Sequence, residues 1–321
     1  MTGAGFLGRH LVQLLLDQGR HVTVMDSLWT GSMDNVRGFD ESRFNYIRCD
    51  VREALPEVEN VEQIYHLACP ASPVHFETRP IDILETCFRG TKNVLDLAVK
   101  TGARVLLAST SEIYGDPQVV PQPETYFGNV NSFGPRSCYD EGKRVSEALA
   151  HSYRTQHGVS VRVARIFNAY GPSMAAHDGR AVPNFVAAAI EGAPIRIYGD
   201  GKATRCFHYA ADCVEGLAAL MESGYEGPVN IGSDREVTVG EVARLVAQVV
   251  ASKTGREQVA PIIYLPKRED DPVRRRPDIT VAEQQLGWRP KVSLEQGIAL
   301  MVDSFLEKGA GRDMGHVQPA L

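Results

Sequence analysis

Short apolar segments alternate with longer segments of helical periodicity over the first half of the chain. Apolar segments of strand length and composition occupy residues 21–26, 44–51, 61–68, 104–109 and 161–168. Helical segments lie between them, after Gly8, over residues 80–101 and from Ser137 onward. Such alternation is typical of an α/β protein with a doubly wound, mostly parallel sheet, in which ligands bind at the carboxyl ends of the strands.

The alternation loosens after Gly171 and Pro172. Helical patterns cover residues 181–192, 212–223, 238–253, 279–287 and 294–306, with a short strand at 195–198. We therefore expect a first domain over residues 1–171 and a smaller, mixed C-terminal lobe over 172–310, with chain crossings between the two possible. Residues 311–321 have the composition of a frayed tail.

A glycine-rich motif begins the chain. Gly3, Gly5 and Gly8 form G-x-G-x-x-G, an amphipathic helix follows, and the next strand ends at Asp26. Glycines there allow a pyrophosphate to approach the helix N-terminus, while Asp26 accepts hydrogen bonds from a ribose diol and repels a 2′-phosphate. The pattern predicts a Rossmann-like domain that binds NAD rather than NADP. Because the motif normally follows a strand, we expect that this first strand is missing from the sequence.

Polar residues follow several of the predicted strands. Asp50 and Val51 stand where an adenine would bind, and Leu67 where the backbone passes the cofactor; the alternative is that they are ordinary strand ends. Thr110 and Glu112 follow the strand at 104–109, which places them at the ligand edge of the sheet. A threonine at a strand end is also a common helix cap, so both interpretations of Thr110 remain open.

Tyr139 and Lys143 stand four residues apart in a segment of helical composition. Positions i and i+4 share one face of a helix, so both side chains can enter one site. A free phenol has a pKa of about 10, and a nearby ammonium favours the phenolate. The spacing therefore suggests a tyrosine base, although the same spacing occurs on helices whose residues lie at the surface.

Composition and charge exclude several classes of protein. The chain has 321 residues, a net charge of −6 and a single basic cluster, which argues against nucleic-acid binding. No apolar run reaches the roughly 18 residues of a membrane span, so we expect no membrane association. The six cysteines form no C-x-x-C pair and are typical of reduced thiols in a cytoplasmic protein, with no metal site expected.

Taken together, these motifs resemble those of the extended short-chain dehydrogenase/reductase family. The glycine loop, Asp26, Thr110, the pair Tyr139 and Lys143, and the segment 165–168 occur in that family's order, over essentially the whole chain. Longer segments are similar to those of the UDP-glucuronate decarboxylases, or UDP-xylose synthases, within the family: residues 70–73, 107–117, 134–144 and 270–278.

This resemblance implies an activity and a set of site residues. UDP-glucuronate would be oxidised at C4 with NAD, lose carbon dioxide as a 4-keto acid, and be reduced again by bound NADH to UDP-xylose. Tyr139 would be the base, supported by Lys143 and Thr110, with Glu112 facing the sugar ring and Arg275 positioning substrate. The implied cofactor residues are Gly3, Gly5, Phe6, Leu7, Gly8, Asp26, Asp50, Val51, Leu67, Tyr139 and Lys143. The implied substrate residues are Glu112, Asn168, Arg180, Asn184, Arg205 and Arg275.

The resemblance also implies a homodimer, formed through helices near residues 85–100 and 141–156. Two positions depart from the family pattern: Thr2 replaces a glycine, and Cys87 stands where the family tends to have asparagine. A UDP-sugar 4-epimerase of the same fold and a non-catalytic protein that binds NAD or a nucleotide sugar remain alternatives. A 4,6-dehydratase would need an aspartate before Glu112, where this chain has Ser111.

Overall fold

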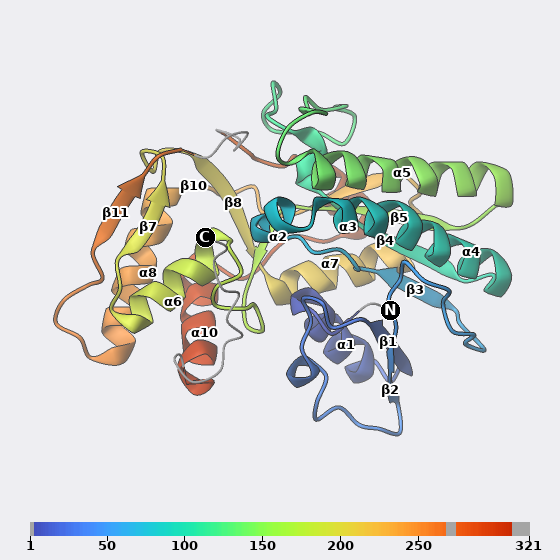
Figure 1. Ribbon diagram of the computed structural model, residues 1–321, viewed down its shortest axis with the longest axis horizontal. Coiled ribbons are helices and arrows are strands. Elements are labelled where there is room, and N and C mark those ends of the chain that lie inside the picture. The colour runs from blue at the N-terminus through green and yellow to red at the C-terminus, as the bar shows by residue number, and fades with distance from the viewer. Residues whose placement is uncertain (1–2, 268–273, 310–321) are drawn as a thin grey trace.

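The computed structural model describes residues 3–267 and 274–309. Its central sheet has four parallel strands in the order β3 (Gln63–His66), β4 (Arg104–Thr110), β5 (Val161–Ile166) and β9 (Pro228–Ile231). A separate parallel pair is formed by β1 (Val22–Asp26) and β2 (Phe44–Arg48). The carboxyl ends of β3, β4 and β5 therefore meet at one edge, as expected for parallel strands (Figure 1).

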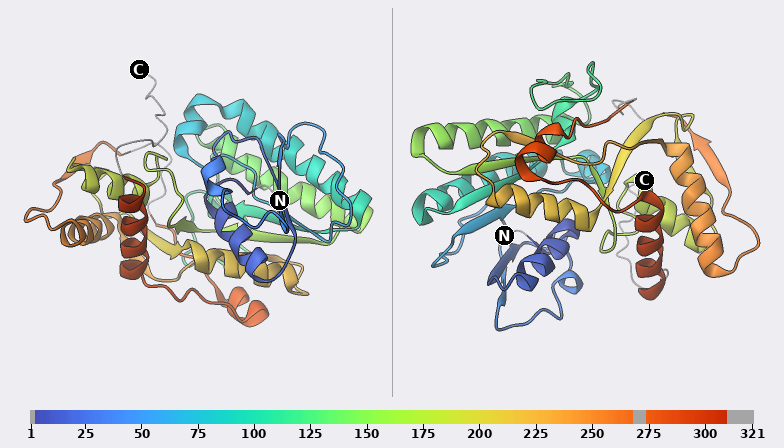
Figure 2. Two further views of the ribbon diagram at one scale, coloured as in Figure 1. Left: turned by 90° about the horizontal axis from the view of Figure 1, so that it is seen from below. Right: turned by 180° about the vertical axis from the view of Figure 1, so that it is seen from behind.

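Helices cover both faces of this sheet (Figures 1 and 2). On one face lie α3 (Pro80–Glu85), α4 (Thr91–Thr101) and α5 (Ser137–His157), and on the other lie α1 (Phe6–Asp17) and α7 (Ala210–Glu222). Strand β4 has apolar side chains on both faces. Val105 and Leu107 pack with the α4 and α5 side, and Leu106 packs with the α1 and α7 side. Burial on both faces explains why these strands have continuous apolar runs.

A second lobe lies beyond the carboxyl edge of the sheet (Figure 1). Its helices are α6 (Ala181–Glu191), α8 (Val239–Thr254) and α10 (Leu294–Glu307), packed on one another around a separate apolar core. Two small sheets complete it. They are β7 (Ile195–Tyr198) paired with β11 (Ile262–Leu265), and β8 (Thr204–Tyr209) between β6 (Asn168–Tyr170) and β10 (Glu236–Thr238). The chain returns from this lobe to add α7, β9 and α9 (Thr280–Leu286) to the first one.

The predicted α/β class with parallel strands is confirmed, but several predicted boundaries are wrong. The strand expected over 44–51 ends at Arg48, and the one expected over 61–68 covers only Gln63–His66, because the residues beyond them turn into the loops that border the site. The helix expected over 80–101 contains a π-helical segment, η2 (Thr86–Gly90), between α3 and α4. The segment 70–73 leads directly into α2 (Pro73–Thr78).

Some expectations concern residues that lie outside the described ranges: Thr2, part of the charged segment 270–278 and the tail 311–321. The expectation about a preceding first strand likewise stays a prediction. Among residues 3–267 and 274–309, the longest apolar helices fall short of what a membrane crossing requires.

Candidate active site

A cleft of about 1860 Å³ is lined by residues at the carboxyl ends of the central strands and by residues of the second lobe. Every residue implied for cofactor, substrate or catalysis lines it, with the exception of Gly3. Both lobes contribute, since Tyr139 comes from α5 and Arg205 from β8. The fold therefore gathers into one cavity residues that stand up to about 270 positions apart in the sequence.

The glycine loop leads directly into α1, as its pattern predicts. A Cβ atom on Gly8 would lie 2.4 Å from Gly3 Cα, so these two glycines allow the loop to pack tightly on the helix. A Cβ atom on Gly5 would meet nothing within 4 Å, and Gly5 is the residue that precedes the helix and lines the cleft. A helix N-terminus open to the cleft fits the pyrophosphate of a dinucleotide.

Asp26 holds the loop that surrounds this N-terminus. Its Oδ2 accepts a hydrogen bond from the backbone N–H of Ala4 at 3.1 Å, and its Oδ1 accepts one from Leu28 at 2.8 Å. Burial raises the pKa of the Asp26 carboxyl above its ordinary value, while the two backbone N–H groups act in the opposite direction. The carboxylate lines the cleft, where a ribose diol can also reach it.

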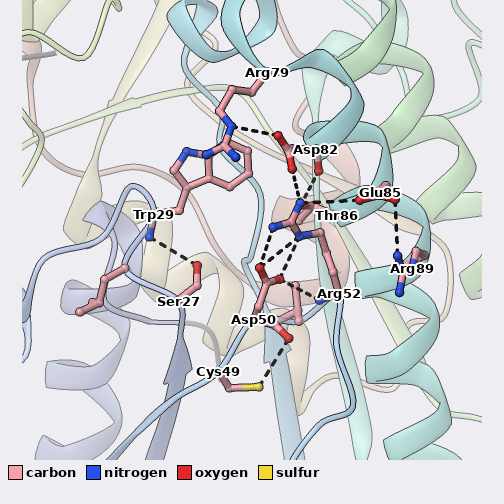
Figure 3. Close-up of polar contacts among 12 residues, drawn as sticks. Ser27, Trp29, Cys49, Asp50, Arg52, Arg79, Asp82, Glu85, Thr86 and Arg89 are labelled. Carbon is pink, nitrogen blue, oxygen red and sulfur yellow. Dashed lines mark hydrogen bonds and ion pairs between the residues drawn. The ribbon is translucent and has the colours of Figure 1, made fainter. Parts of the chain in front are cut away.

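Asp50 and Val51 also line the cleft, as does Leu67, which directly follows β3. Arg52 donates to the Asp50 carboxylate, with Nη2 at 2.8 Å from Oδ2, and these hydrogen bonds hold the pKa of Asp50 below its ordinary value. Arg52 also pairs with Asp82 of α3. Figure 3 shows this cluster next to Trp29, whose ring lies 4.7 Å from the Arg79 guanidinium carbon. The ion pairs of Arg52 hold Asp50 in place at the cleft, and Trp29 presents an aromatic ring to it.

Tyr139 and Lys143 lie one turn apart on α5, and both are buried at the wall of the cleft. Thr110 forms a hydrogen bond with the Tyr139 hydroxyl, which brings the predicted pair of hydroxyls together. Lys143 Nζ donates to the carbonyl of Ala108 at 2.8 Å and lies 5.9 Å from the Tyr139 ring centroid. Burial raises the pKa of Tyr139 well above its usual range, and the Thr110 hydrogen bond partly offsets that effect.

Glu112 and Arg275 are in direct contact, although 163 positions separate them. Arg275 Nη1 lies 2.5 Å from Glu112 Oε1 and Nη2 lies 2.9 Å from Oε2, and Arg136 Nη2 donates to Oε2 at 2.6 Å. Burial alone would raise the pKa of Glu112, but the two guanidinium groups outweigh it and lower that pKa to about 2. Glu112 is therefore an ionised anchor for two arginines. Arg275 Nε is buried and has no hydrogen-bond partner among the described residues.

The predicted nucleotide-binding residues lie on the lobe side of the cleft. Arg180 donates from Nε to both carboxylate oxygens of Asp178 at 2.9 Å, and its guanidinium carbon lies 5.8 Å from the Phe6 ring centroid. Arg205 donates to the carbonyl of Thr204, and Asn184 Oδ1 accepts from Gly179 N. The buried Nδ2 of Asn168 has no hydrogen-bond partner within the described ranges, so it is a donor left for a ligand.

Sequence reasoning missed two charged groups that shape this site. Arg136 lies in the segment 134–144 but no role was predicted for it; it stands one turn before Asp140 and contacts Glu112. Arg165 of β5 forms a two-pronged ion pair with Glu147 of α5, at 3.0 and 2.8 Å, and Ser109 donates to the same carboxylate. A charged residue inside an apolar strand needs a buried partner, which is the signal that could have found this pair. The Arg165 pair fixes α5 against β5, and the Ser109 hydrogen bond fixes it against β4, the strand that leads to Thr110.

Fold and site together are those of a dinucleotide-dependent enzyme of the short-chain dehydrogenase/reductase class. The profile described as GDP-mannose 4,6 dehydratase matches residues 1–301. Among solved structures, UDP-glucose 4-epimerase of Thermotoga maritima with UDP-glucose is 29% identical, with a TM-score of 0.84 and coverage of 95% of this chain and 97% of that one. The dTDP-glucose 4,6-dehydratase DesIV of Streptomyces venezuelae, with NAD bound, is 29% identical with a TM-score of 0.85 and coverage of 95% of both chains.

Curated relatives show which family within this class the chain belongs to. UDP-glucuronic acid decarboxylase 1 of Arabidopsis thaliana is 51% identical over 98% of this chain and 70% of its own length. UDP-glucuronic acid decarboxylase 1 of Danio rerio is 49% identical over 94% of this chain and 71% of its own length. The chain therefore belongs to the UDP-glucuronic acid decarboxylase family of extended short-chain dehydrogenases/reductases.

Proposed function

We propose that this protein is an NAD-dependent UDP-glucuronate decarboxylase, which converts UDP-glucuronate to UDP-xylose and carbon dioxide. The observation that carries the proposal is the buried contact of Arg275 and Arg136 with Glu112, in the same cleft as Tyr139 and Thr110. One end of the site can thus exchange a proton with a sugar hydroxyl, while the other presents fixed positive charge for a sugar carboxylate.

NAD is the cofactor that this cleft fits. The open N-terminus of α1 after Gly5 suits its pyrophosphate, and Asp26 suits the adenosine ribose. Lys143 and Tyr139 lie at the other end, where the nicotinamide ribose would be held. Bound NAD supplies an acceptor of two electrons from the sugar C4 and, once reduced, returns them to the same carbon.

The side chains perform the proton transfers. Tyr139 as phenolate takes the proton of the sugar 4-hydroxyl, and Thr110 donates a hydrogen bond to the same sugar oxygen. The sugar carboxylate is then β to the new ketone. When carbon dioxide leaves, the electrons of the broken bond flow to the C4 oxygen, which the Tyr139 and Thr110 hydroxyls stabilise as an enolate. A proton then adds to C5.

Glu112 holds the arginines in place, and Arg275 orients the substrate. Because the pKa of Glu112 is lowered to about 2, its carboxylate keeps its charge and holds Arg275 and Arg136 in place. Arg275 Nε, buried and without a described partner, is available to orient the substrate. As the carboxylate departs as neutral carbon dioxide, the charge that faces these arginines disappears, so they must orient the carboxylate without overstabilising it.

A 4-epimerase of the same fold is the main competing function, because it shares the oxidation at C4. Incubation of the purified protein with NAD and UDP-glucuronate, followed by nuclear magnetic resonance, separates the two. Our proposal predicts UDP-xylose and an equal amount of carbon dioxide, with no lasting build-up of NADH. Formation of UDP-galacturonate with no carbon dioxide would instead identify an epimerase, and an inert substrate would favour a non-catalytic binding protein.

The assembly that we propose is a homodimer. Exposed apolar side chains on α3, η2 and α5 support it: Ile81 is 73% exposed, Leu84 43%, Phe88 48% and Val145 40%. A dimer that pairs these helices would remove this surface from water. We also propose the cytoplasm as its location, since all six cysteines are free thiols, as expected in a reducing compartment.

A further inference from the structure

Two cysteine sulfurs meet at the wall of the cleft. Cys69 Sγ and Cys87 Sγ lie 3.5 Å apart, in hydrogen-bond contact. Cys69 follows β3, is partly exposed and lines the cleft, whereas Cys87 lies in the π-helical segment η2 and is only 1% exposed. A thiol reachable from the cleft thus has a second thiol directly behind it.

We propose that Cys69 and Cys87 form a peroxide-sensitive dithiol whose disulfide closes down the adjacent active site. A disulfide bond is about 2.0 Å long, so the sulfurs must approach by about 1.5 Å, a displacement within reach of side-chain rotation and a small loop shift. The Cys87 end is fixed, because Ser146 Oγ donates to the Cys87 carbonyl at 2.8 Å. The loop between β3 and α2, which carries Cys69 and is called the Cys69 loop below, is therefore the part that moves.

The environment of the pair favours oxidation. A thiolate is the species that attacks a peroxide. The hydrogen bond from the Cys69 thiol lowers the pKa of Cys87 to about 7, with the Lys143 ammonium adding to the effect, while the same contact raises the pKa of Cys69. The Cys87 thiol is therefore easier to deprotonate than an ordinary thiol.

The chemistry balances with hydrogen peroxide as the named oxidant. A thiolate of the pair attacks one peroxide oxygen, the O–O bond breaks, and the departing hydroxide takes up a proton to become water. The sulfenic acid that remains is attacked by the second sulfur, its S–O bond breaks, and a second water leaves as the disulfide forms. Overall, two thiols lose two electrons and two protons, and one peroxide is reduced to two waters.

The disulfide would disturb the site from both ends. At one end, a Cβ atom on Gly142 would lie only 3.0 Å from Cys87 Sγ, so this sulfur packs on α5 next to Lys143. At the other, Ser72 in the Cys69 loop donates to the Asp178 carbonyl, and Asp178 holds Arg180. Pulling the loop toward α5 shifts the cleft wall relative to both catalytic and substrate residues. Displacements of about 1 Å can cost around a hundredfold in rate, so we expect at least a tenfold loss of turnover.

Mass spectrometry of the full-length protein tests the proposal. Reduced protein is treated with hydrogen peroxide, free thiols are alkylated, and the digest is examined for a peptide that links Cys69 to Cys87 and lacks the mass of two hydrogen atoms. We expect that link, weaker NAD binding and lower turnover, all reversed by dithiothreitol. The proposal is overturned if Cys69 and Cys87 remain alkylated separately, or if the linked protein binds NAD and turns over as the reduced protein does.

Matched variants give the control. Cys87→Ser should lose the link and the reversible inactivation, and Cys69→Ser serves the same purpose should the first variant fold poorly. Cys49→Ser should keep both, because Cys49 lines the same cleft but its thiol donates a hydrogen bond to the Asp50 carbonyl and not to another sulfur among the described residues. Equal inactivation of all three variants would contradict the proposal. Because the link and NAD binding are measured without the sugar, they do not depend on the decarboxylase activity.

Discussion

The protonation of Tyr139 decides whether this site can begin its reaction. The spacing to Lys143 suggested a phenol whose pKa a nearby ammonium lowers. In the structure, Lys143 donates to the carbonyl of Ala108, and burial raises the pKa of Tyr139 well above its usual range. Without ligands the phenol is therefore protonated at neutral pH. Thr110 is the neighbour that works in favour of the phenolate.

A pH profile tests this arrangement. Since a base must be deprotonated and the pKa of Tyr139 lies above neutrality, kcat/KM should rise with pH through the neutral range, by up to about tenfold per pH unit. Thr110→Val removes the hydrogen bond that lowers this pKa, so its rising limb should shift to higher pH than that of the wild type. A Thr110→Ser variant, which keeps the hydroxyl, should restore the original limb. Identical profiles for Thr110→Val and the wild type would remove Thr110 from this role.

Replacing Glu112 tests whether its carboxylate is the counter-charge of Arg275 and Arg136. Glu112→Gln leaves Arg275 and Arg136 buried without their counter-charge, which should lower the free energy of unfolding by about 3–5 kcal/mol and abolish most decarboxylation. Glu236→Gln is the control, because Glu236 pairs with Arg274 outside the cleft. Thermal unfolding and carbon dioxide release measure the two effects. A stable, active Glu112→Gln variant would contradict the assigned role.

The same carboxyl makes stability depend on pH. The pKa of Glu112 is lowered from 4.5 to about 2 on folding, so its contribution is complete above pH 4.5 and is lost as the pH falls toward 2. The wild type should therefore lose stability over that interval more steeply than Glu112→Gln, as measured by denaturant unfolding at each pH. Parallel losses would show that Glu112 is not held as a carboxylate.

At the scale of elements, Gly5, which precedes α1, and Gly8, which lies in its first turn, have different roles. Gly8→Ala would force a Cβ atom to within 2.4 Å of Gly3 Cα, so it should destabilise the protein by about 1–3 kcal/mol and weaken NAD binding. Gly5→Ala meets no atom within 4 Å and should keep the melting temperature while weakening NAD binding. Calorimetry of unfolding and of NAD binding separates the two. Equal melting temperatures would disprove the packing argument.

The proposed dimer depends on the apolar surface of α3, η2 and α5. Phe88→Glu places a charge in that surface and should give a monomer in sedimentation experiments. Val259→Glu is the matched control, since Val259 is 53% exposed but lies outside these helices, and it should leave the assembly unchanged. A monomeric wild type, or a dimeric Phe88→Glu variant, would place the interface elsewhere or remove it.

Element patterns in the sequence predicted the long, fully buried parts of this fold. The strands β4 and β5 were recognised from their apolar residues, and α5 from its helical composition. The strands β6, β8, β9, β10 and β11 were missed. Most are only three or four residues long and are stabilised by strands distant in the sequence, as when β9 pairs with β5. The residues of such a strand are therefore a poor guide to its presence. The π-helical segment η2 was missed for a similar reason, since helical periodicity does not distinguish it.

At the scale of the whole molecule, the site exists only because two lobes meet. The chain leaves the sheet after β5 to build the first part of the second lobe, returns as α7 and β9, and then crosses again to add β10, α8 and β11 before it brings Arg275 to Glu112. No local pattern predicts a contact across 163 positions, and only the resemblance to decarboxylases suggested that pair. The contact of Arg136 with Glu112 and the approach of Cys69 to Cys87 required the structure itself.

The central claim is that the Tyr139 hydroxyl starts the decarboxylation, and Tyr139→Phe tests it most directly. This change removes one oxygen atom and keeps the ring that stacks on Phe76 at a centroid distance of 4.8 Å, so the fold should remain. Carbon dioxide release from UDP-glucuronate is measured for both proteins at equal NAD occupancy and with equal melting temperatures. We predict that the variant is slower by about 10²- to 10⁴-fold. Near-normal release by a folded, NAD-loaded Tyr139→Phe variant would contradict the account.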